Sequence, residues 1–183
     1  MFKSNKKIDT KTYAFIKKQI MKTLYFIRHA KSSWDFPQLA DDERPLTEKG
    51  IKRTKKLGNY LENNNILPEL IISSYANRAF HTAQIIAKKI GFPEKNIKIE
   101  RSIYSSSIDN IFSILFGINN SYKSVMLFGH NPTFTNLANY FIEDKIDNLP
   151  TSGYVSVDFE TDNWNEIANC KIIKTTVIFP KEL

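Results

Sequence analysis

Three short apolar runs recur along the chain, at residues 24–27, 70–72 and 125–128. Apolar runs of this length without a polar interruption are typical of strands that are buried on both faces of a mainly parallel sheet. The pattern therefore predicts three buried strands that lie far apart in the sequence.

The hydrophobic pattern changes near the C-terminus. Residues 155–160 alternate strictly between apolar and polar side chains. This alternation predicts a half-exposed edge strand, and residues 171–179 predict a second strand that returns beside it.

Helical periodicity fills the segments between the strands. Residues 79–90 carry apolar side chains at i, i+4, i+7 and i+11, with Gly91 as a stop signal, and residues 134–141 repeat the pattern at i, i+3, i+4 and i+7. Thr47 is the expected N-cap of a helix over about 48–63. Strands that alternate with helices predict an α/β fold: a three-layer α/β/α sandwich around a mixed, mostly parallel sheet.

Composition limits the class of protein. With 183 residues, 42% of them hydrophobic and 25% charged, the chain suits a globular domain with a substantial core. No apolar run approaches the roughly 20 residues that cross a bilayer, and the first residues lack the features of a secretory signal. The single cysteine, Cys170, fits a reducing compartment. We therefore expect a cytoplasmic protein without a membrane partner.

The net charge of +7 is unevenly distributed. Residues 1–22 hold seven lysines and one acid, Asp9, so the rest of the chain has 19 basic and 18 acidic residues. A lysine-rich segment ahead of a nearly neutral body is usually a solvated, mobile tail, which argues against a nucleic-acid partner. Because Met21 opens a suitable start, we interpret residues 1–20 as an N-terminal extension and residues 21–183 as a single domain.

Cationic and titratable side chains follow each of the three buried strands. The first strand ends in Arg28 and His29, Arg78 opens the helix after the second, and His130 follows the third. In open α/β sheets, ligands bind in the crevice outside the carboxyl ends of the strands. Asn131 and Pro132 also form a strong helix start, with asparagine as the expected N-cap, which would add a helix N-terminus to an anion site.

Taken singly, each of these residues has an ordinary structural interpretation in packing or turns, and His81, inside a helix, keeps that interpretation. The joint placement of two arginines and two histidines at three strand ends favours function instead. The histidines and Cys170 show none of the close spacings of zinc ligands, and no glycine-rich phosphate loop is present. We therefore expect no metal and no cofactor.

Two arginines and two histidines without a metal suit phosphoryl transfer. Guanidinium groups bind phosphoryl oxygens bidentately, and a neutral imidazole is a competent nucleophile near pH 7. A second imidazole can donate a hydrogen bond to the phosphoryl group, and a covalent phosphohistidine divides the transfer into two easier steps. On this interpretation Arg28 holds the phosphoryl group that His29 attacks.

The chain resembles a known family, the histidine phosphatase superfamily, and within it the small SixA-type phosphohistidine phosphatases. The resemblance extends over nearly all of residues 21–183 and rests on five segments: LYFIRHAKSSW, DERPLTEKG, LIISSYANRAFHTAQIIA, MLFGHNPTFTNLANYF and DNLPTSG. It implies a phosphoglycerate-mutase-like fold without the large helical insertion of bigger members.

The resemblance also implies roles for particular residues. His29 resembles the phosphorylated nucleophile of the family, and Arg28, Arg78 and His130 the rest of the phosphate pocket. Further pocket residues, each expected to bind or support the phosphate, are Ser32, Asp35 and Arg44. Asp35 occupies the place where related phosphoglycerate mutases carry a phosphate-contacting asparagine.

The sequence departs from the family pattern in two ways. Ala30 replaces the glycine of the family's RHG motif, a mild restriction of the backbone. The glutamate that donates a proton in larger members has no counterpart in RSIYSSS, where Tyr104 and Ser105 are poor donors at neutral pH. The nearest carboxyl groups in the sequence, Asp35 and Asp42, are the two candidates for the donor.

The missing acid bears on the substrate. An alkoxide leaving group needs a proton, and general acid catalysis contributes roughly 10²- to 10⁴-fold, whereas an imidazole leaving group needs less help. We therefore expect a metal-independent phosphatase that removes phosphate from phosphohistidine in proteins and binds phosphate-like anions. Two alternatives stay open: a phosphatase for a small phosphomonoester, and a phosphate- or phosphoprotein-binding module with weak turnover.

Because six of the seven net charges lie before residue 23, outside every pattern of the fold, removal of residues 1–20 should leave catalysis and melting temperature nearly unchanged. Steady-state kinetics and thermal unfolding of the truncated and full-length chains measure this. A large loss of stability would instead favour docking of an amphipathic helix through Tyr13, Phe15, Ile16 and Ile20.

Overall fold

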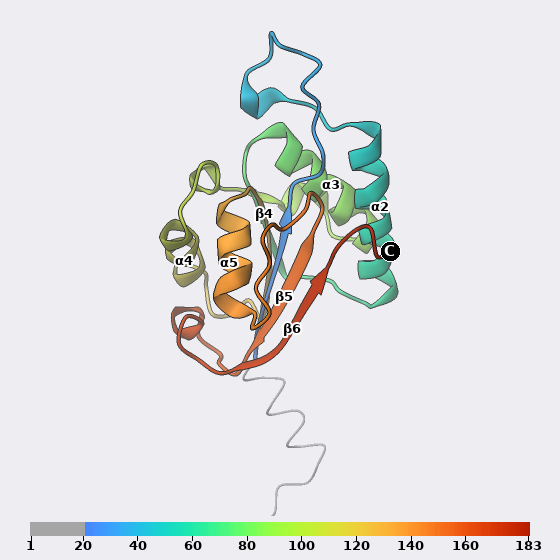
Figure 1. Cartoon of the computed structure of the whole chain (residues 1–183). Coiled ribbons are helices and arrows are strands. Elements are labelled where there is room, and N and C mark those ends of the chain that lie inside the picture. Colours follow the sequence, from blue (N-terminus) through green and yellow to red (C-terminus); the bar gives the residue numbers. More distant parts are fainter. Residues whose placement is uncertain (1–20) are drawn as a thin grey trace, which may run out of the picture.

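A six-stranded mixed sheet forms the centre of the protein in the computed structural model, which describes residues 21–183 (Figure 1). The expected N-terminal extension, residues 1–20, lies outside the described residues. The strand order is β3-β2-β4-β1-β5-β6. The strands are β1 (Lys22–Arg28), β2 (Leu70–Ser73), β3 (Lys98–Ile99), β4 (Ser124–Gly129), β5 (Tyr154–Phe159) and β6 (Ile172–Ile178).

Five of the six strands run in one direction, and β5 runs in the opposite direction. Strands β3, β2, β4 and β1 pair in parallel, whereas β5 is antiparallel to β1 and β6 is antiparallel to β5. All three buried runs predicted from the sequence are parallel strands, and they are neighbours in the sheet. The predicted mixed, mostly parallel sheet is confirmed.

Helices cover both faces of the sheet (Figure 1). The α-helices are α2 (Glu48–Asn63), α3 (Asn77–Ile90), α4 (Ile108–Phe116) and α5 (Thr133–Phe141). Short 3-10 turns occur at η1 (Asp41–Glu43), η2 (Glu94–Asn96), η3 (Arg101–Ile103) and η4 (Trp164–Glu166). One core packs α2 and α3 against the sheet and the other packs α4, α5 and η4, which gives the predicted three layers. No helix within residues 21–183 is long and apolar enough to cross a membrane.

The predicted boundaries of α2 and α3 are confirmed. The Thr47 hydroxyl accepts a hydrogen bond from the backbone N–H of Gly50 at 3.0 Å, as an N-cap does. Gly91 ends α3 with a φ of 75°, a left-handed conformation that glycine adopts without strain.

The N-cap assignment of Asn131 is wrong. Pro132 occupies the cap position of α5, and the Asn131 side chain turns away from the helix. Its amide donates to Asn148 Oδ1 at 2.8 Å and to the Leu149 carbonyl at 3.1 Å. Partners from a distant loop therefore replaced the local capping bond that the sequence favoured.

The edge assignment of the alternating strand is also wrong. Residues 154–159 form β5, which pairs on both sides, with β1 and with β6. The alternation arises because Val155 and Val157 enter the core beneath α4 and α5, whereas Ser156 and Asp158 lie on the opposite, partly covered face. The outer strands are β6, which was predicted, and the two-residue β3, which was not.

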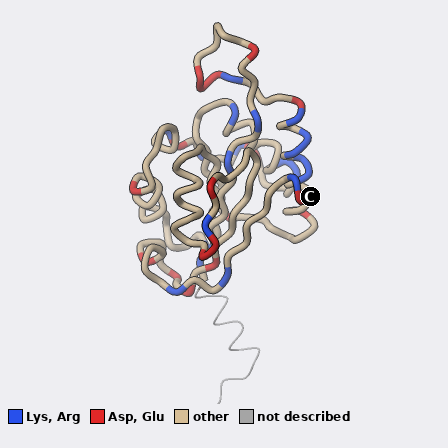
Figure 2. The backbone as a smooth tube through the Cα atoms, in the orientation of Figure 1, with Lys and Arg blue, Asp and Glu red and all other residues tan. Residues whose placement is uncertain are grey.

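Basic residues gather along the outer face of α2 (Figure 2). The helix carries Lys49, Lys52, Arg53, Lys55 and Lys56. Its inner face buries Thr54, Leu57 and Leu61 against α3 and the sheet. The cations are therefore the solvated side of an amphipathic helix whose first turn lies against the loop after β1.

Gly50 sets that contact between α2 and the loop after β1. A Cβ atom at Gly50 would lie 2.3 Å from the Lys31 carbonyl oxygen, so any side chain there must push the helix and the loop apart. We expect Gly50→Ala to lower the free energy of unfolding by about 1–3 kcal/mol, as overpacking does, and to reduce activity because the loop carries His29 and Arg44.

Gly117→Ala is the matched control. Its Cβ atom would meet only backbone oxygens at 3.5 and 3.6 Å, and its φ of −79° suits alanine. Chemical denaturation of both variants measures the difference. Equal effects at the two positions would contradict the proposed role of the contact between Gly50 and Lys31.

Candidate active site

The carboxyl ends of β1 and β4 bring the two strand-end histidines together. Arg28 pairs with Gly129 in the parallel register, and the His29 N–H donates to the Gly129 carbonyl at 3.0 Å. The next residue on each strand, His29 and His130, carries an imidazole, and the ring centroids are 5.0 Å apart. The pairing of the two strands therefore fixes the distance between the two side chains.

His29 is held in one tautomer. Its Nδ1 lies 2.8 Å from the Ala30 carbonyl oxygen, which can only accept, so Nδ1 carries the proton and Nε2 has a free lone pair. Burial, followed by the nearby arginines, lowers the pKa of His29 to about 4. The imidazole is therefore neutral at pH 7, the state in which Nε2 can act as a nucleophile.

His130 is also buried and neutral. Burial first, and then the neighbouring His29 and Arg78, lower its pKa to about 3. Its Nε2 lies 2.9 Å from the Ser74 hydroxyl, which itself accepts the Ala76 N–H at 3.4 Å. When Ser74 gives its hydrogen to Nε2, the proton of the ring lies on Nδ1, which is buried without a partner among the described residues.

Arg28, the last residue of β1, uses only part of its guanidinium in contacts with the protein. Its Nη1 donates to the Leu149 carbonyl at 2.8 Å and to Asn148 Oδ1 at 3.2 Å. Its Nε is buried and has no partner within residues 21–183. Burial lowers the pKa of Arg28 from its usual value, so the cation is held in an environment that favours an anionic partner.

Arg78 reaches the site from the first turn of α3 and contacts a carboxylate. Its Nη2 lies 2.8 Å from Asp41 Oδ2, and its Nη1 donates to the Asp41 backbone carbonyl at 2.5 Å. The carbonyl of Arg78 accepts from the Thr82 hydroxyl, which accepts in turn from the Ala30 N–H at 2.9 Å. The first turns of α3 therefore hold the loop that carries His29, as well as the Arg78 cation.

Asp41 is the carboxylate that the sequence analysis missed. Besides Arg78 it binds Arg44 Nη1 at 3.0 Å and accepts from the Tyr104 hydroxyl at 2.6 Å. The Tyr104 hydrogen bond first, and then the contacts with the two arginines, lower the pKa of Asp41 to about 2. The same hydrogen bond raises the pKa of Tyr104. A signal was present in the sequence: Asp41 precedes Arg44 by three residues, so a helical turn places both on one side.

The supporting residues predicted from the sequence lie beside the site but bind one another. Arg44 donates from Nε to the Ser33 carbonyl at 2.8 Å and from Nη2 to Ser32 Oγ at 2.9 Å. Asp35 is exposed and accepts from the Ser33 hydroxyl at 2.6 Å. Their direct contact with phosphate stays a prediction.

The two proton-donor candidates, Asp35 and Asp42, stay predictions, and a different carboxylate, Asp41, contacts Arg78. Asp42 follows Asp41 on the short helical turn η1 and makes no side-chain hydrogen bond or ion pair within the described residues. Asp35 is bound only to Ser33, two residues away. In the sequence Asp41 is one of three consecutive acidic residues, and only its tertiary contacts with Arg44 and Arg78 distinguish it from the other two.

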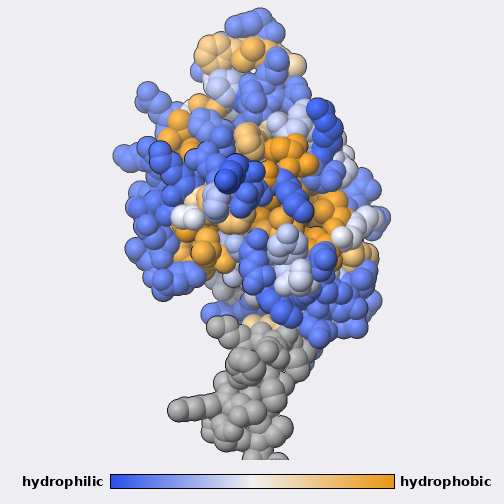
Figure 3. Space-filling view, turned by 180° about the vertical axis from the view of Figure 1, so that it is seen from behind, coloured by the Kyte–Doolittle hydropathy of each residue, from blue (hydrophilic) through white to orange (hydrophobic). Residues whose placement is uncertain are grey.

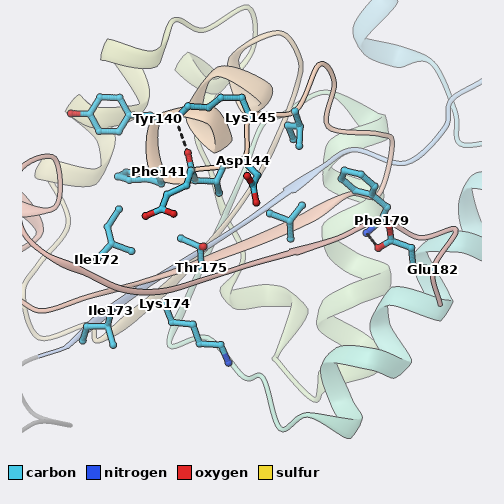
Figure 4. Close-up of a pocket in the computed structure, with 14 residues that line it drawn as sticks. Tyr140, Phe141, Asp144, Lys145, Ile172, Ile173, Lys174, Thr175, Phe179 and Glu182 are labelled. Carbon is cyan, nitrogen blue, oxygen red and sulfur yellow. Dashed lines mark hydrogen bonds between the residues drawn. The ribbon is translucent and has the colours of Figure 1, made fainter.

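Two surface pockets lie away from the strand-end arginines and histidines. One, of about 810 Å³, lies between α5 and β6 (Figure 4), and another, of about 820 Å³, lies between α2 and α3. The first has apolar walls of Phe141, Ile172 and Phe179 with a rim that includes Lys145 and Glu182. Neither is lined by the strand-end arginines and histidines, so the chemistry, not the volume of a hollow, identifies the site.

Comparison with known proteins agrees with this constellation. Residues 24–102 match the sequence profile of the histidine phosphatase superfamily (branch 1). The solved structure of a putative phosphohistidine phosphatase SixA from Agrobacterium tumefaciens is similar, with 25% identity and a TM-score of 0.71, over 85% of this chain and 97% of that one. A protein histidine phosphatase SixA complexed with tungstate has the same fold, with a TM-score of 0.73 and 19% identity over 87% and 98% of the two chains.

Curated relatives match shorter segments. An uncharacterised chloroplast protein of Arabidopsis thaliana is 38% identical over 87 residues, 47% of this chain and 40% of that protein. A 2,3-bisphosphoglycerate-dependent phosphoglycerate mutase of Bifidobacterium longum is 36% identical over 66 residues, 34% of this chain and 26% of the mutase. The chain thus spans less than half the length of these curated relatives.

These findings confirm the resemblance seen in the sequence: residues 24–102 match the histidine phosphatase superfamily, and the fold is that of solved structures similar to the chain. Its structural neighbours include SixA-type phosphohistidine phosphatases. Family and neighbours together indicate a phosphatase of the histidine phosphatase type.

The depressed pKa values of His29 and His130 predict a pH dependence of stability. Between pH 6.5 and about 4 the unfolded chain binds protons at these positions and the folded chain does not, so the free energy of unfolding should fall as pH falls through this window. Denaturation measured at intervals across the window tests this, and His29→Asn should reduce the slope. Asp41 contributes only at lower pH, because its stabilising effect is lost between 3.8 and about 2. An unchanged slope in the variant would contradict the burial of a neutral His29.

Proposed function

We propose that the protein is a phosphatase that acts through a phosphohistidine on His29 and removes phosphate from phosphohistidine in proteins. One observation carries the proposal. Within residues 21–183, the buried side-chain polar atoms without a partner are Arg28 Nε, His130 Nδ1 and Asn131 Oδ1. Buried donors are almost always paired, so the unpaired Arg28 Nε, together with His130 Nδ1 when Ser74 donates to Nε2, points to a ligand with acceptor oxygens. A tungstate complex of a protein with this fold supports an oxyanion as that ligand.

The proposed reaction has two displacements. His29 Nε2 attacks phosphorus, the bond from phosphorus to the leaving nitrogen or oxygen breaks, and the leaving group takes up a proton. Water then attacks the phosphohistidine, the bond between phosphorus and Nε2 breaks, and inorganic phosphate leaves. Arg28, Arg78 and His130 stabilise the charge on the phosphoryl oxygens in both steps.

Asp41 supports a substrate with a weakly basic leaving group. A carboxyl group with a pKa of about 2 is ionised at neutral pH, so it is a poor acid in the free protein. Leaving groups that need little protonation, such as imidazole or phenolate, lose least from a poor donor. A phosphorylated histidine therefore suits this site better than an alkyl phosphate.

The position of Asp41 also favours a second candidate, a phosphatase for a small phosphomonoester. Its carboxylate shares Arg78 with the incoming phosphoryl group. If the phosphate displaces it from the guanidinium, the pKa of Asp41 rises and the group becomes a better donor. In that case an alkoxide could leave with a proton from Asp41.

A leaving-group series separates the two candidates. We expect kcat/KM to fall steeply from phosphohistidine through aryl phosphates to phosphoserine, by several orders of magnitude, because the unprotonated alkoxide is a poor leaving group. Asp41→Asn should change aryl and alkyl substrates by similar factors. Asp144→Asn, which alters an exposed carboxylate in the pocket between α5 and β6, is the matched control.

His29→Ala provides the blank for this series, with no acid-labile phosphoryl label and no turnover, while oxyanions still bind through Arg28 and Arg78. Label that persists in the His29→Ala protein would rule out the proposed nucleophile. A flat dependence on the leaving group, with alkyl substrates selectively impaired by Asp41→Asn, would establish Asp41 as the donor and favour a small phosphomonoester.

A further inference from the structure

The loop between β1 and η1 exposes aromatic side chains next to the active site. Trp34 is 75% exposed and Phe36 is 44% exposed. Five large hydrophobic residues are exposed within residues 21–183. Two of them, Trp34 and Phe36, lie on this loop with one residue between them. Single exposed apolar residues are common on protein surfaces, whereas two close together beside a site are typical of a contact surface.

The loop projects beyond the carboxyl end of the sheet (Figure 1). The space-filling view shows hydrophobic residues at this tip of the molecule (Figure 3). The segment joins His29, at the end of β1, to Asp41 on η1. We call residues 34–36 the aromatic tip.

Trp34 is linked to the anion site by a short chain of contacts. The Arg44 guanidinium lies over its ring, 3.1 Å from the centroid. Arg44 in turn binds Asp41 at 3.0 Å, and Asp41 binds Arg78 at 2.8 Å. The indole therefore lies two side chains away from Arg78, which we assign to the phosphoryl group.

The aromatic tip is held in position before any partner binds. Ser33, which is buried, accepts the Asp35 N–H at 2.9 Å and donates to the Asp35 carboxylate at 2.6 Å. A backbone hydrogen bond from Leu39 to Phe36 closes the next turn at 3.1 Å. An aromatic side chain that is fixed in advance loses little entropy on binding, which is why such residues dominate protein interfaces.

We propose that the aromatic tip binds apolar side chains that flank the phosphorylated histidine of a protein substrate. The inference rests on the proposed function and narrows its substrate class. A small phosphorylated metabolite fills the anion site alone, whereas a polypeptide extends from it over the adjacent loop. The tip therefore adds affinity only for a substrate that continues beyond the phosphoryl group.

Three probes with the same leaving group test this: free phosphohistidine and two synthetic peptides of equal length with a central phosphohistidine. One peptide has leucine and phenylalanine flanks, and the other has serine and glycine flanks. We expect kcat/KM for the apolar peptide to exceed that for the polar peptide by roughly ten-fold, and Trp34→Ala to abolish this preference. Turnover of free phosphohistidine should change little.

Phe36→Ala tests the same surface without altering the stacking on Arg44, and should lose part of the preference. Leu67→Ala is the matched control: Leu67 is 56% exposed but lies at the opposite, amino end of β2. Leu67→Ala should leave kcat/KM for all three probes unchanged. Equal losses on the three probes in both tip variants would overturn the inference, because the loop would then act only by positioning the catalytic residues.

Equilibrium binding gives an independent measurement. In the His29→Ala protein, the apolar peptide should shift Trp34 emission to shorter wavelength and protect it from acrylamide, while Trp164, which is fully buried, contributes a constant background.

A chain that turns over free phosphohistidine but shows neither peptide preference nor this protection would overturn the inference alone. Absence of turnover on every probe would instead overturn the proposed function. Concentration-dependent burial of Trp34 without peptide would show that a second copy of the chain covers the tip, and would also overturn the inference.

Discussion

The parallel pairing of β1 with β4 is the constraint on which the site depends. Its register places Arg28 opposite Gly129, so that the residues just beyond the two strand ends are both histidines. A hydrogen bond from His29 to Gly129 extends the pairing past the last strand residue. A slip of one residue would turn the side chains of β1 to the opposite faces of the sheet and remove the site. The core on both faces of β1 therefore stabilises the geometry of the two imidazoles.

Burial then decides the protonation states. Removal from water is the main reason why both imidazoles remain neutral, and the nearby guanidinium groups of Arg28 and Arg78 add to it. The arginines keep their charge and are only partly matched by protein groups. Asp41 supplies a carboxylate, but its contacts are with Arg78 and Arg44, and Arg28 Nε has no protein partner in the described part of the chain. The proposed oxyanion would complete this arrangement.

One loop combines the chemistry with access to the site. Between β1 and α2 the chain carries the proposed nucleophile His29, the aromatic tip, Asp41 and Arg44. Contact with Gly50 at the start of α2 holds the loop at one end, and the chain of contacts from Trp34 to Arg78 ties its middle to α3.

Sequence patterns alone determined the layers, the three buried strands and the caps at Thr47 and Gly91, because these depend on local periodicity and on contacts within a few residues. They also placed Arg28, His29, Arg78 and His130 at one edge, since parallel strands end at the same side of a sheet. The tertiary structure determined the contacts that local sequence patterns do not encode. The Asn131 side chain binds Asn148 and does not cap the helix that follows it. Strand β5 pairs with β6 as well as with β1, and Asp41, not Asp42, forms the ion pair with Arg78. Each of these outcomes depends on a partner that is distant in the chain and becomes a neighbour only when the sheet has formed.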